Sequence, residues 1–165
     1  MRSYDWCWGV ERTNGDTFYT YFWQSLMGTT MNKIEWSDSF SVGVELFDEQ
    51  HKTIISMINK LIETPNINTN SAIITALLTG MIEYAAEHFA DEERLMRQHD
   101  YPDYSDQRTQ HGDFIERTAE FCSDGRLQVD SIPESILVYL RQWWVDHILK
   151  EDMAYKTFFK DKELA

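Results

Sequence analysis

Cysteine is scarce in this sequence. Cys7 and Cys122 are the two cysteines among 165 residues, and they form no C-x-x-C pair. The chain therefore offers neither a disulfide framework nor a cluster of thiolate ligands for a structural metal ion. The segment after Arg2 also lacks the apolar core of a signal peptide. We therefore expect a cytoplasmic protein in a reducing environment.

Long apolar runs and an excess of basic residues are missing as well. No run approaches the roughly 18 apolar residues of a membrane-spanning helix. Lysine and arginine number 15 against 28 aspartates and glutamates, which gives a formal net charge of −13. Nucleic acids and anionic membranes bind clusters of basic side chains, so neither is an expected partner. The sequence also has no Gly-rich phosphate loop and no nucleophile motif, which favours a binding protein over an enzyme.

What the sequence does contain is the composition of one globular domain, with 42% hydrophobic and 26% charged residues. Residues 1–30 differ from the rest, because they are rich in aromatic side chains but follow neither a helical nor a strand period. We expect the domain to comprise residues 31–165. Residues 1–30 are then either an accessory arm outside the core or a segment upstream of the true start. The rival interpretation packs their aromatic side chains on the outside of the domain.

The hydropathy pattern from residue 47 onward has the period of amphipathic helices. Pro65 and Pro102 fall in breaks of the pattern, and Pro133 is a favoured first-turn residue. No strand pattern competes, and the connections are short. We therefore predict an all-α, antiparallel up-down four-helix bundle. Its helices are expected at about 48–63, 71–98, 104–122 and 133–155 or beyond.

Histidines lie on the apolar faces of these predicted helices, one on each. They are His51, His88, His111 and His147. Glu92 follows His88 by one turn on the same face, and Asp152 follows His147 by five residues. A lone inward histidine is more often a hydrogen-bonded core residue than a ligand, but four of them with two acids predict a metal site. Burying unpaired carboxylates is costly, and a cation would offset that cost.

The kind of metal follows from the types of ligand. Imidazole and carboxylate groups suit iron, zinc or manganese. The absence of sulfur favours a di-iron site over a structural zinc site.

Four motifs in this pattern resemble those of the hemerythrin family, particularly the bacterial hemerythrins. The resemblance covers about residues 34–158. It rests on Val42-Gly43-Val44 with Asp48-Glu49-Gln50-His51-Lys52, on His88-Phe89-Ala90-Asp91-Glu92-Glu93, on Tyr101-Pro102-Asp103-Tyr104, and on the run from Trp143 through His147-Ile148 to Asp152. Any one motif is moderately specific, and together they are highly specific.

The resemblance implies two non-haem iron ions bridged by two carboxylates and an oxo or hydroxo group. Glu92 and Asp152 would be the bridging carboxylates. His51 and His88 would bind the iron that keeps an open position for dioxygen. His111 and His147 would bind the other iron.

Gln107 departs from the family pattern, which has a third histidine for the second iron at this position. Its amide oxygen is a harder and weaker ligand than imidazole. Either it binds the second iron, or it stays back and leaves a water or an open position, or the second iron binds so weakly that the site is often mononuclear. We favour the first two, because the other six positions match. The remaining alternative is that Gln107 only forms a hydrogen bond in the core.

A second departure is Trp144, where the family usually has a leucine over the ligand pocket. The larger indole either narrows the pocket and slows ligand entry, or rotates out and leaves the pocket intact, or is simply a core residue. The residues that neighbour the ligands along their helices are the candidate pocket lining: Ile55, Phe89, Trp144 and Ile148.

The function implied by the resemblance is reversible binding of dioxygen, or of another small diatomic ligand, for carriage, storage or delivery to an oxygen-using enzyme. One alternative is a sensor of oxygen, nitric oxide or redox state, although no signalling domain is evident in the sequence. Another is a redox enzyme, such as a peroxidase or nitric oxide scavenger, with a modified second iron site.

Overall fold

The computed structural model describes residues 31–63, 71–123 and 134–162. Its helices belong to one compact unit, Asn32–Ala165. The expectation for residues 1–30 lies outside the described residues. Among the described residues there is no strand, and none of the described helices has both the length and the apolar character needed to cross a membrane.

Four long helical segments make up the described fold. They are α2 (Glu45–Glu63), α3 (Ser71–Gln98), α4 (Tyr104–Ser123), and a last segment composed of α5 (Glu134–Asp146), the π-helical η3 (His147–Asp152) and α6 (Met153–Lys160). A short 3-10 turn, η1 (Asp38–Phe40), precedes α2. The predicted helix boundaries therefore agree with the structure to within a few residues.

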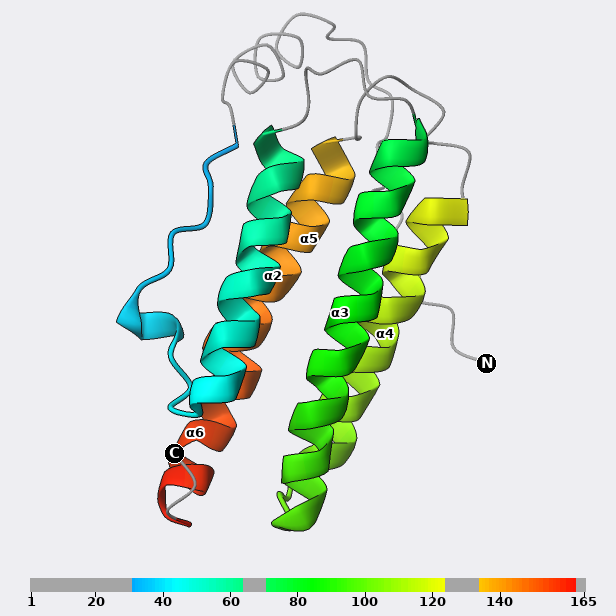
Figure 1. The fold of residues 1–165 in the computed structure, drawn as a ribbon. Coiled ribbons are helices and arrows are strands. Elements are labelled where there is room, and N and C mark those ends of the chain that lie inside the picture. The colour runs from blue at the N-terminus through cyan, green and yellow to red at the C-terminus, as the bar shows by residue number, and fades with distance from the viewer. Residues whose placement is uncertain (1–30, 64–70, 124–133, 163–165) are drawn as a thin grey trace, which may run out of the picture. The chain divides into compact units, whose positions relative to one another are not determined.

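The helices run alternately up and down, as Figure 1 shows. Helix α2 contacts both α3 and α5, and α3 contacts α4. The bundle closes between α4 and α5, where the rings of Phe114 and Trp143 lie 4.3 Å apart. The predicted antiparallel four-helix bundle is confirmed.

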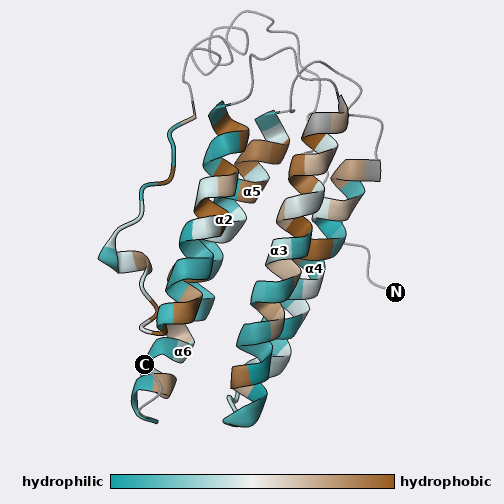
Figure 2. Ribbon diagram, viewed as in Figure 1, coloured by the Kyte–Doolittle hydropathy of each residue, from teal (hydrophilic) through white to brown (hydrophobic). Residues whose placement is uncertain are grey.

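The core is built from the inward faces of all four segments. Burial of each large apolar side chain contributes roughly 1.5–3 kcal/mol to folding. The N-terminal half of α3 is the more hydrophobic half and its C-terminal half the more hydrophilic (Figure 2). Fully buried side chains include Ile54, Ile58, Ile74, Leu78, Met81, Phe114, Leu140, Tyr155 and Phe159.

The entry to α2 is fixed by a hydrogen-bonded loop. We expected Asp48 to lie at the helix start, but α2 begins at Glu45 and Asp48 lies within its first turn. From there Asp48 accepts hydrogen bonds from the Val42 backbone N–H at 2.8 Å and from the Ser41 hydroxyl at 2.6 Å. Gly43 has a φ of 84°, a left-handed conformation that favours glycine. The loop thus sets where His51 enters the bundle.

The last segment is not the unbroken α-helix that the pattern predicted. From His147 to Asp152 the chain forms a π-helix, in which the Met153 backbone N–H donates to the Ile148 carbonyl five residues earlier. In an α-helix, residues five apart point about 140° away from each other. The wider π turn brings His147 and Asp152 to the same face, and such turns occur frequently at functional sites.

Candidate metal centre

The six predicted ligands meet in the middle of the bundle. His51 comes from α2, His88 and Glu92 from α3, His111 from α4, and His147 and Asp152 from the π-helical segment η3. None of the six side chains is exposed by more than 3%. Four separate helical segments therefore place imidazole and carboxylate groups in one buried volume.

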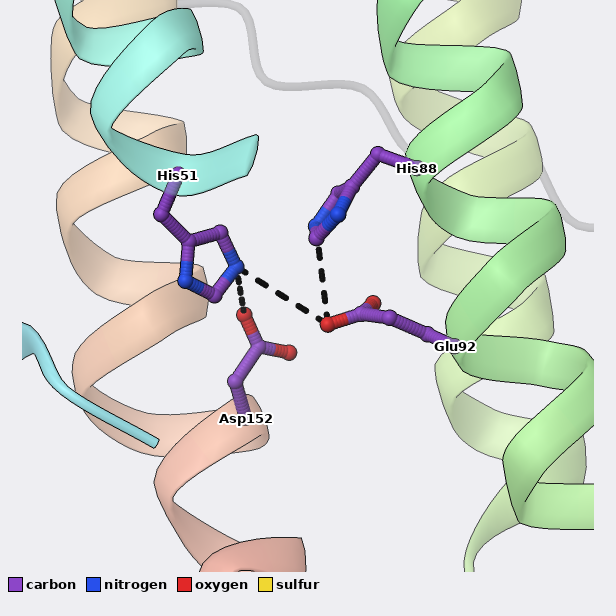
Figure 3. A group of neighbouring side chains, drawn as sticks. All are labelled: His51, His88, Glu92 and Asp152. Carbon is purple, nitrogen blue, oxygen red and sulfur yellow. Dashed lines mark ion pairs between the residues drawn. The ribbon is translucent and has the colours of Figure 1, made fainter. Parts of the chain in front are cut away.

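Four of these side chains point toward one another, as Figure 3 shows. We call His51, His88, Glu92 and Asp152 the first half-site. The His51 Nε2 atom lies 3.3 Å from Asp152 Oδ2 and 3.8 Å from Glu92 Oε1. The His88 Nε2 atom lies 3.5 Å from the same Glu92 oxygen. One atom from each residue lies within 4.8 Å of the others, an arrangement that could hold a metal ion.

A second cluster, which we call the second half-site, comprises Glu92, His111 and His147. The Nε2 atoms of the two histidines lie 3.1 Å apart. Two nitrogen ligands at right angles around one ion, each about 2.1 Å away, are separated by about 3 Å. The facing nitrogens therefore have the spacing of two neighbouring ligands of one ion.

The two carboxylates span both half-sites. Glu92 directs Oε1 toward His51 and His88, whereas its Oε2 lies 3.4 Å from His111 Nε2. Asp152 directs Oδ2 toward His51, whereas its Oδ1 lies 3.3 Å from His147 Nε2. Each carboxylate thus presents one oxygen to each cluster, which is the arrangement that a bridging ligand requires.

Side chains outside the ligand set hold two of the imidazoles in position. His88 Nδ1 lies 2.9 Å from Gln50 Oε1, and the Gln50 amide nitrogen donates to Asp91 at 2.9 Å. Because the Gln50 oxygen can only accept, His88 carries its proton on Nδ1. Its Nε2 lone pair is therefore free to face the first half-site.

His111 is held in the same way. Its Nδ1 lies 3.1 Å from the Glu93 carboxylate, which fixes the proton on Nδ1 and leaves the Nε2 lone pair toward the second half-site. Arg97 lies 3.8 Å from the other Glu93 oxygen. Carboxylate partners of this kind orient a histidine ligand and raise its basicity.

Burial controls the ionisation of the cluster. It lowers the pKa of His51, lowers those of His88 and His147 well below the usual value, and lowers that of His111 to about 3. The four imidazoles are thus neutral at pH 7 and have lone pairs to offer. Burial also raises the pKa of Glu92 and Asp152 well above the usual range. Two cations in this volume would favour both carboxylates in their charged form.

Unpaired polar atoms concentrate at this centre. Buried polar groups in folded proteins almost always have hydrogen-bond partners, so a group of exceptions needs an explanation. Lone pairs on nitrogen and oxygen that find no donor are what a bound cation would satisfy. Among the described residues, the buried side-chain atoms without a hydrogen-bond partner belong to His51, His88, Glu92, Gln107, Trp144, His147 and Asp152.

Gln107 is buried one turn before His111, with 2% of its surface exposed. It lies close enough to Asp152 to lower the pKa of that carboxyl, although burial raises that pKa more strongly. Neither atom of its amide group makes a regular hydrogen bond. Gln107 therefore lies beside Asp152, and its amide has no hydrogen-bond partner elsewhere in the described part of the core.

Trp144 is completely buried, which excludes the alternative that its ring rotates out. Its ring lies 5.8 Å from that of His88 and stacks on Phe89 at 5.4 Å. Phe89 also stacks on His111 at 3.9 Å, so this ring packs against the second half-site as well. Ile55 and Ile148 are buried too, and their place in a pocket lining stays a prediction.

The sequence reasoning missed three supporting residues: Gln50, Glu93 and Tyr155. Gln50 and Glu93 lie inside the motifs quoted above, next to the predicted ligands His51 and Glu92. Tyr155 is fully buried, and its hydroxyl donates to Glu92 Oε1 at 2.5 Å. The sequence signal that could have identified Tyr155 was its place three residues after Asp152, on the apolar face of the same helical segment.

Comparisons with known proteins agree with this geometry. The family model of the hemerythrin HHE cation binding domain matches residues 42–159. A bacteriohemerythrin of Stenotrophomonas maltophilia is 31% identical over 76% of this chain and 80% of its own length. Another from Methylococcus capsulatus is 30% identical over 70% of this chain and 88% of its own length.

Solved structures show the same relationship. A crystal structure of wild-type hemerythrin is 28% identical in sequence and superposes with a TM-score of 0.69. The matched region covers 76% of this chain and 97% of the wild-type hemerythrin chain. The matched part includes all six predicted ligands, because the family model spans them from His51 to Asp152. The chain belongs to the hemerythrin family.

Proposed function

We propose that this protein binds two iron ions at the paired half-sites and uses them to bind dioxygen reversibly. The observation that carries the proposal is the set of buried, unpaired nitrogen and oxygen atoms shared between two clusters by Glu92 and Asp152. Iron at this centre would supply the electrons that dioxygen needs in order to bind. Its relatives by sequence are bacteriohemerythrins.

The distances support the ligand roles that we propose. His51 and His88 would bind one ion, and His111 and His147 the other, with Glu92 and Asp152 bridging the two. The unpaired Gln107 amide lies beside Asp152, and we propose that its oxygen serves the second half-site as a weak ligand. Gln50 and Glu93 keep the Nε2 lone pairs of His88 and His111 directed at the ions.

The surrounding side chains keep water away from the centre. Ile55, Phe89, Trp144 and Ile148 are all exposed by 4% or less and are the proposed pocket lining. An apolar enclosure of this kind disfavours the release of charged oxygen species and the transfer of protons from solvent. Carriage, storage and delivery to an oxygen-using enzyme would all use the same binding equilibrium.

Gln107 favours a second candidate function. With an amide where an imidazole would stand, the second ion would have a weaker ligand set and an exchangeable position. Such an ion would suit a peroxidase, a nitric oxide scavenger or a redox sensor better than it would suit stable oxygen carriage.

Spectroscopy of the reduced, iron-loaded protein tests the proposal. Anaerobic loading with ferrous iron should give about two irons per chain by elemental analysis. Air should then produce a visible charge-transfer band that disappears when oxygen is removed. Immediate conversion to the oxidised protein without a reversible band would favour the redox alternative. Absence of bound iron would overturn both functions.

A further inference from the structure

One unpaired buried atom at the centre belongs neither to a predicted ligand residue nor to Gln107. Most of the unpaired buried atoms are ligand atoms of the half-sites or belong to the Gln107 amide. The remaining three are the Nδ1 atoms of His51 and His147, which carry the ring proton when Nε2 faces a metal ion, and Trp144 Nε1, an indole N–H that donates and cannot accept. A cation can satisfy lone pairs on nitrogen and oxygen, but it cannot satisfy an N–H group. Two bound iron ions would therefore leave Trp144 unpaired.

The position of Trp144 limits what could accept its hydrogen bond. The side chain has no exposed surface, and Nε1 has no hydrogen-bond partner among the described residues. Between ring centres, Trp144 lies 5.8 Å from His88 of the first half-site and 6.5 Å from both His51 and His147. Buried tryptophans usually find a partner for this N–H. The acceptor must therefore be a small group admitted to the centre.

Packing fixes the indole where it is. Phe89 stacks on it with an interplanar angle of 15°, and Phe114 meets it edge-on at 5.4 Å. A ring held on both sides cannot swing away when a ligand enters, so its N–H is preorganised. A preorganised donor inside a water-excluded site binds an acceptor more strongly than a surface donor does.

We propose that Trp144 donates a hydrogen bond from Nε1 to the small ligand at the first half-site, either dioxygen or a small anion. The inference rests on the proposed metal-binding function. It assigns Trp144 a positioning role that a leucine at the same place could not perform. The indole would select for ligands that carry a hydrogen-bond acceptor and would slow their release.

The test uses azide as the probe and the oxidised, iron-loaded full chain as the protein. Trp144→Phe keeps an aromatic ring between Phe89 and Phe114 but removes the N–H. Absorbance titration should show azide binding about tenfold more weakly to the variant than to the native protein, because a hydrogen bond to a charged acceptor is lost. Tyr139→Phe, five residues earlier on α5, removes a different aromatic donor and should leave azide affinity unchanged.

The unfolding temperature provides an independent readout. Trp144→Phe should lower it in the metal-free protein, because the smaller ring leaves space in a fully buried site. Azide should raise the unfolding temperature of the iron-loaded native protein by more than that of the iron-loaded variant, and an equal rise in both would overturn the inference. If Trp144→Phe fails to fold, Trp144→Leu is measured in its place with the same expected loss of azide affinity.

The outcomes also separate the inference from the function on which it rests. Equal azide affinity in the native and Trp144→Phe proteins, with iron bound in both, would overturn the role of Trp144 and leave the metal centre intact. A native protein that binds no iron would overturn the proposed function, and the inference with it.

Discussion

The two half-sites are built from the same kinds of group but have different surroundings. The first half-site combines His51 and His88 with both carboxylates, and all four side chains are completely buried. The second half-site has His111 and His147, with Gln107 where a third imidazole stands in the family. Glu93 orients His111 but is itself partly exposed, and surface hollows on either side of α4 reach His111 and His147.

This difference indicates a division of roles. The shared carboxylates of Glu92 and Asp152 couple the two halves, so neither ion is expected to bind independently of the other. The first half-site is enclosed, and it has both histidines that the family pattern implies for its iron. The second lacks the third imidazole of the family pattern and lies closer to solvent. We therefore expect unequal affinity for two metal ions, and the following changes test that expectation.

The largest effect should come from Glu92→Gln, because this carboxylate faces both half-sites. The neutral amide removes a negative charge between two cations, and metal affinity should fall by about 100-fold or more in both halves. Anaerobic titration with ferrous iron measures it. Glu87→Gln, at an exposed position on the same helix, should have no effect. Retention of one tightly bound iron in Glu92→Gln would show that Glu92 serves a single ion.

Gln107→His should make the two halves more alike. An imidazole at this buried position gives the second half-site a third nitrogen ligand, and we expect affinity for the second iron to rise about tenfold or more. Calorimetric titration should show two resolved binding steps in the native protein that merge in the variant. Thr109→His, on an exposed face of α4, is the matched control. An unchanged number of irons per chain and an unchanged autoxidation rate would show that Gln107 takes no part in the chemistry of the centre.

Gln50→Leu and Glu93→Leu should act on opposite halves. Each change removes the acceptor that holds an Nδ1 proton in place. The imidazole of His88 in the first variant, and of His111 in the second, can then rotate or change tautomer. We expect Gln50→Leu to weaken the tighter binding step by about 10–100-fold. Glu93→Leu should weaken the looser step by about tenfold, since water can replace this partly exposed carboxylate. Each variant serves as the other's control, and loss of the same step in both would contradict the assignment.

The smallest effect should come from Tyr155→Phe. The tyrosine hydroxyl donates to the Glu92 oxygen that faces the first half-site, so its removal loses one buried hydrogen bond. Thermal unfolding of the metal-free protein should show a loss of about 1 kcal/mol. Affinity for the tighter iron should change less than tenfold in the same variant. A larger effect on the looser step would mean that Tyr155 acts through the other carboxylate oxygen.

Much of this fold was visible in the sequence, because helical periodicity is a local property. The apolar positions of α2 and α3 predicted both helices closely, and tertiary packing did not override them. The convergence of His51, His88 and Glu92 was also predictable, since inward polar residues on neighbouring helices must meet somewhere in the core.

Other features could not be obtained from local patterns. The Gln50–His88 contact joins residues 38 apart, and the Tyr155–Glu92 hydrogen bond joins residues 63 apart. Only the packing of the helices decides such pairings. The sequence also could not show that Trp144 is fully enclosed, because a large side chain can face either way at a helix edge. The π turn was missed because no single residue type encodes it.

The π turn has a consequence for changes in chain length. Leu149 and Lys150 are exposed, so substitutions there should be tolerated. Deleting either one would convert the wide turn to an α-helix in which the aspartate follows His147 by four residues, about 40° away around the helix axis, so it would still face the two clusters. Tyr155 and Phe159 would likewise keep their inward faces. Deleting both residues would instead rotate everything after them by about 100° and turn the aspartate away from the clusters.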